Sequence, residues 1–141
     1  MTPIESTLRS VRVLHLIFLL TVALFIINLR MLQPAERGIS FLTVSVFVLL
    51  CLSDIAIAIS FRARMITPSI ERLRVNPQDA AALGRWRSGV ITSFTFAETV
   101  VLLGFMLKIL GAGWNVAGVF FVVGILLLLA WAPKLDMSRG N

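Results

Sequence analysis

Four apolar runs, separated by short polar stretches, constrain this chain more than any single motif does. They cover residues 13–32, 39–61, 90–110 and 116–131 of the 141-residue sequence. A helix needs about 20 apolar residues to cross the hydrocarbon core of a bilayer, which is about 30 Å thick. We therefore expect a single membrane domain, residues 1–141: an all-α integral membrane protein whose four transmembrane helices form an antiparallel bundle.

The composition favours the same class of protein. Hydrophobic residues make up 58% of the chain, charged residues only 14%, and the mean hydropathy is +0.95. Soluble domains average roughly one charged residue in four. The net charge of +6 belongs to basic residues that flank the apolar runs, with no separate basic domain. We therefore expect the lipid bilayer, and no nucleic acid, as a partner.

The placement of basic residues predicts the topology. Cytoplasmic segments of membrane proteins carry an excess of Lys and Arg. With a cytoplasmic N terminus, ten of the 13 basic residues lie inside, and Arg30, Arg37 and Lys108 lie outside. The ten are Arg9, Arg12, Arg62, Arg64, Arg72, Arg74, Arg85, Arg87, Lys134 and Arg139. We expect both termini in the cytoplasm. The first run exceeds the roughly 7–15 residues of a signal-peptide core, so we expect an uncleaved span, and a bacterial inner membrane as the location.

The basic cytoplasmic segment, residues 62–88, joins the second and third runs. It holds two helix-start signals: Thr67-Pro68, and Asn76-Pro77 followed by Asp79. We expect two short helices here, one over residues 68–75 lying along the headgroups and one beginning at Pro77, with its continuation into the third run left open. Six arginines of the segment are candidate contacts for anionic lipids, with ordinary positive-inside topology as the alternative explanation. They are Arg62, Arg64, Arg72, Arg74, Arg85 and Arg87.

One acid lies inside each of the two central runs. Asp54 lies seven residues before Phe61, and Glu98 lies ten residues after Ser88. The helix rise then places both about 10–15 Å below the cytoplasmic surface. An ionised carboxyl group at that depth costs about 2.5–3.5 kcal/mol on the translocon scale. At least one acid should be protonated, paired or exposed to water, and the sequence leaves open whether the two face each other.

The neighbours of Glu98 are rich in hydroxyl groups. Ser93, Thr95 and Thr99 are the candidate supporting polar residues, because Ser and Thr serve as hydrogen-bond partners inside membranes. A stripe of small residues at positions 97, 104 and 111 predicts that another helix approaches closely. We interpret the acids and hydroxyls as a structural polar lock. A proton- or ion-linked site and recognition of a cationic partner are the alternatives.

The nine residues AETVVLLGF, Ala97 to Phe105, resemble the ion-carrying helix of rotary-ATPase proteolipid subunits. In that family a mid-membrane Glu follows a small residue and precedes an apolar stretch with glycine. The resemblance implies that Glu98 carries a translocated proton or sodium ion. The second run departs from the family, because it lacks the glycine ladder that lets proteolipid helices pack into a ring.

No pattern of catalytic residues is evident, so we expect no enzyme, cofactor or metal. The single histidine, His15, is expected at headgroup level, and Cys51 is expected to pack as a small hydrophobe. The expected role is a structural or accessory subunit that associates through its helices with itself, as a homo-oligomer, or with partner subunits of a larger membrane complex. The alternative is a small proton- or ion-coupled translocator that uses Glu98 and Asp54.

Overall fold

The computed structural model describes residues 2–133, and every regular element in that range is a helix. The helices are α1 (Pro3–Leu32), α2 (Phe41–Val75), α3 (Ala80–Ile109) and α4 (Trp114–Ala130). The prediction of an all-helical chain is therefore confirmed. Three helices, α1, α2 and α3, are long and apolar enough to cross a membrane, and α4 is a shorter apolar helix of 17 residues.

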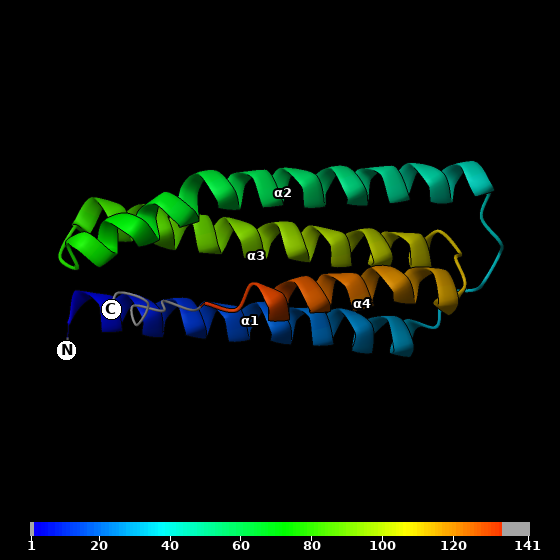
Figure 1. Cartoon of the computed structure of the whole chain (residues 1–141). Helices are drawn as coiled ribbons and strands as arrows, with labels where there is room; N and C mark the ends of the chain where they lie inside the picture. Colours follow the sequence, from blue (N-terminus) through cyan, green and yellow to red (C-terminus); the bar gives the residue numbers. More distant parts are fainter. Residues whose placement is uncertain (1, 134–141) are drawn as a thin grey trace.

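Helix α3 lies at the centre of the molecule (Figure 1). Its backbone lies close to all three other helices, and α1 also contacts α4. The backbone of α2 lies close to α3 alone among the described helices. Figure 1 shows α2 on one side of α3, α1 and α4 on the other, and successive helices running in alternating directions.

Local sequence signals explain where α1 begins and ends. The hydroxyl group of Thr2 accepts from the backbone N–H of Glu5, and the Glu5 carboxylate accepts from the N–H of Thr2. This capping box, with Pro3 in the first turn, starts the helix ten residues before the apolar run. At the other end Gln33 adopts a left-handed conformation, with φ +41°, and closes the helix.

The predicted short helices of residues 62–88 are not separate elements in the structure. The first is wrong because α2 continues without a break to Val75, with Pro68 inside it. Proline removes one helical hydrogen bond. However, Ile66 before Pro68 and Leu73 after it are both buried in the core, and this packing stabilises the helix on both sides of the proline. Figure 1 shows α2 bending in its green part, near the turn to α3.

The second predicted helix start is displaced by three residues. Asn76 ends α2, and Asp79 is the residue that caps α3, where its Oδ1 atom accepts from the N–H of Ala82 at 2.9 Å. From Ala80 on, the second helix runs into the third run without a break, which is the continuation that the sequence analysis left open. The sequence Asn-Pro-Gln-Asp offers two capping side chains, and the more C-terminal one starts the helix.

Small residues allow α3 and α4 to approach closely. A Cβ atom on Gly104 would lie 2.8 Å from Phe120 Cβ, and one on Gly124 would lie 3.0 Å from the carbonyl oxygen of Ala97. Two members of the predicted small-residue stripe, at positions 97 and 104, therefore do lie against another helix. Gly111 instead forms the α3–α4 turn, where its φ of +104° favours glycine.

Candidate functional site

Asp54 lies in the apolar part of α2 and is half-buried. Its Oδ2 atom is inaccessible to solvent and has no hydrogen-bond partner among the residues that the structure describes. A buried polar atom without a partner costs free energy, so it calls for an explanation. Among the described acids, Asp54 is therefore the one with a solvent-inaccessible oxygen that lacks a hydrogen bond.

Glu98 lies on the side of α3 that faces α1. It follows Phe94 by four residues and precedes Phe105 by seven, and both phenylalanines contact aromatic rings of α1. Gly89, which packs against Ile66 of α2, lies nine residues earlier, about half a turn around the helix. Within residues 2–133 no hydrogen bond joins Glu98 to Asp54, and their action as a pair stays a prediction.

The hydroxyl groups near Glu98 bond to their own helix. Ser93, Thr95 and Thr99 each donate to the backbone carbonyl four residues earlier, at 2.7, 3.3 and 3.0 Å. A hydroxyl group has one proton to donate, so in this arrangement none of them donates to the Glu98 carboxyl group. These bonds satisfy the hydroxyl groups inside an apolar helix.

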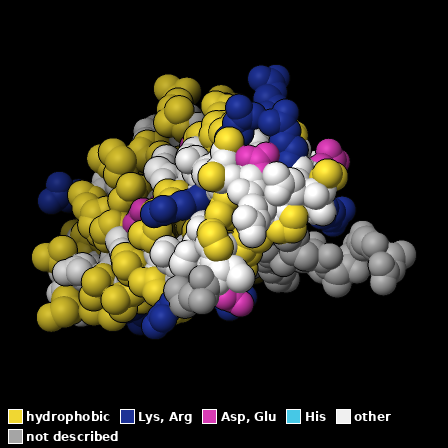
Figure 2. Space-filling view, turned by 90° about the vertical axis from the view of Figure 1, so that its left-hand side faces the viewer, with side chains coloured by type: hydrophobic (Ala, Val, Ile, Leu, Met, Phe, Trp, Pro, Cys, Tyr) yellow, Lys and Arg dark blue, Asp and Glu magenta, His cyan; other side chains and the backbone are white. Residues whose placement is uncertain are grey.

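The six arginines of the basic segment divide into three groups. Arg62 is half-buried and lies 5.1 Å from the centre of the Trp131 ring. Three exposed arginines, Arg64, Arg72 and Arg85, line a single pocket of about 140 Å³ between α2 and α3. Arg74 and Arg87 are exposed and lie outside this pocket. Figure 2 views this end of the molecule and shows Lys and Arg side chains gathered toward the top.

An ion pair between a buried lysine and an exposed glutamate, at the opposite end, was missed by the sequence analysis. Lys108 is only 1% exposed, and its Nζ atom donates to Glu36 Oε1 at 2.7 Å and to the carbonyl of Ala112 at 3.1 Å. The Trp114 ring lies 5.0 Å away. The bond from Lys108 lowers the pKa of the Glu36 carboxyl group, which lies in the α1–α2 loop. The available signal was that both charges fall on the same predicted side of the membrane.

His15 is buried among the helices, and its expected depth at headgroup level stays a prediction. Its Nε2 atom lies 3.0 Å from the carbonyl oxygen of Leu128, and its ring stacks on Phe94 with centroids 4.9 Å apart. Since a carbonyl group only accepts, Nε2 carries the proton and donates. The last carbonyl groups of a helix lack partners within it. The His15 ring therefore satisfies one of these carbonyl groups, that of Leu128, near the end of α4.

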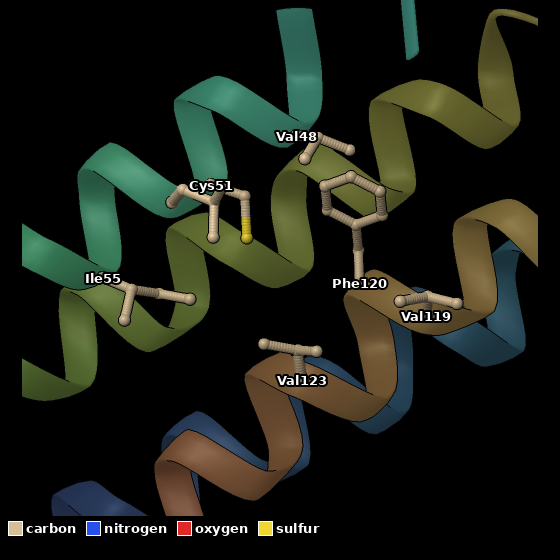
Figure 3. Close-up of a pocket in the computed structure, with 7 residues that line it drawn as sticks. Val48, Cys51, Ile55, Val119, Phe120 and Val123 are labelled. Atoms are coloured by element: carbon tan, nitrogen blue, oxygen red, sulfur yellow. The ribbon is translucent and has the colours of Figure 1, made fainter. Parts of the chain in front are cut away.

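An apolar pocket of about 250 Å³ opens between α2 and α4 (Figure 3). Figure 3 shows Val48, Cys51 and Ile55 of α2 opposite Phe120 and Val123 of α4. The lining is wholly apolar. Cys51 packs as a small hydrophobe there, because it is buried and clusters with Phe120.

Within the described part of the chain, no three metal-ligating side chains of His, Cys, Asp or Glu gather in one place. Comparisons of the chain with protein families, curated proteins and solved structures found no match. The class of protein supported here is a helical protein with three candidate membrane-spanning helices. Any more specific assignment depends on the residues described above.

Proposed function

We propose that this protein crosses the membrane four times, with both termini in the cytoplasm and its helices in an antiparallel bundle. Helix α4 supports a fourth span: its 17 residues measure about 26 Å, and a span shorter than the hydrocarbon core is accommodated by local thinning. The basic residues near the α2–α3 turn support the orientation. Lys134 and Arg139, which enter the charge count, lie outside the described residues.

We infer that the role of the protein in that membrane is assembly, as a structural or accessory subunit. The observation that carries this proposal is the uncovered side of α2. The backbone of this helix lies close to one other helix only, its apolar side chains such as Leu49 (63%) and Ile57 (56%) are exposed, and it carries the half-buried Asp54. Because Oδ2 is enclosed within the chain, a protein partner reaches only the other oxygen of this carboxyl group, to which lipid tails offer no hydrogen bond.

Cysteine cross-linking in native membranes tests this role. In a Cys51→Ser background we expect Leu49→Cys and Ile57→Cys on α2 to give disulfide-linked species on mild oxidation. Leu16→Cys and Leu20→Cys on α1 are matched controls, because their native side chains are 64% and 60% exposed. They should give little product. The readout is non-reducing electrophoresis of the full-length chain.

The mass of the product identifies the partner. A species of twice the chain mass indicates a second copy, and a different mass indicates another subunit. Equal yields from α1 and α2, or none from α2, would contradict assembly through α2. Random collision in the membrane would produce equal yields, since the control positions are equally exposed.

A second candidate function is proton- or ion-coupled translocation by Glu98 with Asp54. Two observations favour keeping it. The Oδ2 atom of Asp54 has no partner among the described residues, and Glu98 forms no hydrogen bond there. Carboxyl groups inside a membrane that are not committed to a structural bond are free to bind and release a proton.

For translocation we expect a pH gradient across proteoliposomes containing the purified protein to dissipate faster than in protein-free vesicles. Glu98→Gln should remove most of the difference because an amide cannot carry the proton, and Asp54→Asn should reduce it. Glu71→Gln, a change at an exposed acid in the basic segment, serves as the control. Flux that equals that of empty vesicles would rule out this function and leave the assembly role standing.

A further inference from the structure

The pocket between the cytoplasmic parts of α2 and α3 combines positive charge with an apolar wall. Its lining residues are Arg64, Met65, Pro68, Ser69, Arg72 and Arg85. Two arginines come from α2, at positions eight residues apart, and the third comes from α3. The pocket has a volume of about 140 Å³. Since a water molecule takes about 30 Å³, the pocket has room for one phosphate group.

The positive charge of this pocket is not neutralised by the described part of the chain. Between residues 2 and 133 the only ion pair is the one that Lys108 forms with Glu36, far from these arginines. Three arginine side chains line one small space, so an anion among them lowers the electrostatic energy. The planar fork of donors on arginine matches phosphate oxygens in two-point hydrogen bonds.

A neighbouring hollow limits where the anion lies. It shares Pro68 and Arg72 with the pocket but adds the acids Glu71 and Asp79. An anion is repelled by these carboxylates, so it should bind on the side of Arg72 that faces Arg64. Ser69 does not donate to the anion in this arrangement, because the one proton of its hydroxyl group goes to the carbonyl of Met65.

The depth of the pocket matches the phosphate layer of a bilayer. Arg64 lies three residues beyond Phe61, the predicted end of the second span, and Arg85 lies five residues before Val90. These separations correspond to about 4.5 and 7.5 Å along a helix. Headgroups add roughly 5–7 Å on each side of the hydrocarbon core. The inner edge of the pocket, at Arg64 and Arg85, therefore falls at headgroup level on the cytoplasmic side, and Arg72, eleven residues beyond Phe61, lies further out.

We propose that this pocket binds a phosphate group through Arg64, Arg72 and Arg85. Two sources share that chemistry: the headgroup of an anionic phospholipid in the cytoplasmic leaflet, and a small soluble phosphate ester. The depth argument depends on the membrane placement proposed above, but the site does not depend on the assembly role. Binding here and cross-linking through α2 are separate measurements, so one can fail while the other succeeds.

Native mass spectrometry of the full-length protein in detergent tests the site. The probes are phosphatidylglycerol, phosphatidylcholine with the same acyl chains, and glycerol 3-phosphate. We expect Arg72→Gln/Arg85→Gln to weaken phosphatidylglycerol binding about tenfold, because charged hydrogen bonds are lost. Arg74→Gln/Arg87→Gln removes the same charge outside the pocket and should change binding less than about twofold.

Each outcome decides something. Preference for phosphatidylglycerol over phosphatidylcholine, with no competition from glycerol 3-phosphate, identifies a lipid site. Binding of glycerol 3-phosphate without lipid identifies a soluble ester. Equal weakening in the two double variants, or binding of neither anionic probe, overturns the proposal. Thermal melting checks that each variant is folded. If Arg72→Gln/Arg85→Gln does not fold, Arg64→Gln takes its place, with about threefold weakening expected.

Discussion

Gly124→Leu should destabilise the protein by on the order of 3 kcal/mol. The new side chain has no space, because a Cβ atom on Gly124 would already collide with the Val101 side chain and lie 3.0 Å from the Ala97 carbonyl oxygen. Backbone atoms of α3 form part of this contact, so α4 would have to move away from α3. The measurement is the loss of helicity on heating or on titration with a denaturing detergent, followed by circular dichroism.

Gly118→Leu is the matched control for this prediction. Gly118 lies on the same helix, but nothing lies within 4 Å of the position where its Cβ atom would be. Leucine also favours a helix over glycine, by most of the roughly 0.8–1 kcal/mol that separates alanine from glycine, so this variant should be as stable as the native protein or slightly more stable. Equal destabilisation of both variants would mean that α4 does not pack on α3 as described.

Glu36→Gln should be more damaging than Lys108→Met, although both break the same ion pair. Lys108 is 1% exposed, so removal of its carboxylate partner leaves a buried charge uncompensated. Lys108→Met removes that charge and leaves Glu36, which is 55% exposed, in contact with water. We expect the Tm to fall by several degrees for Glu36→Gln and by less for Lys108→Met. When both changes are combined, the Tm should fall no further than in Glu36→Gln alone.

The same pair predicts a pH dependence. The pKa of Glu36 is lowered in the folded protein by its hydrogen bond with Lys108. A lowered carboxyl pKa stabilises the folded state above the pKa of the unfolded chain, near 4.5, and this stabilisation disappears as the pH falls through the folded-state value. Melting curves between neutral and acidic pH should show this loss in the native protein and not in Glu36→Gln. An identical acid response in both would contradict the assignment, with Glu71→Gln as the control.

The apolar runs were sufficient to predict the four helices, but not where α1 and α3 begin or where α2 ends. Each predicted run overlaps one helix, because continuous hydrophobicity of that length has few other structural outcomes. The polar extensions of α1 and α2 were not predicted, since they carry no continuous apolar run. Pro68 also reads in sequence as the start of a helix, and only the burial of Leu73 against the core reveals that α2 continues.

The candidate sites depended on information that a linear pattern does not contain. The rotation of each helix decides whether Glu98 faces Asp54, and sequence spacing leaves that rotation open. Two buried polar side chains, Lys108 and His15, also have hydrogen-bond partners that are distant in sequence. Lys108 bonds a residue 72 positions away, and His15 bonds a carbonyl group 113 positions away. Charge counting placed Lys108 and Glu36 on the same predicted side of the membrane but did not pair them.

The central position of α3 has a consequence for the order in which the protein acquires its structure during synthesis. Helices α1 and α2 emerge first, yet their backbones do not approach each other, and the core residues of both pack against α3. Domains made on the ribosome fold as their parts become available. The first half of this chain has no tertiary structure to form by itself, so the third helix determines when the nascent chain becomes a folded protein.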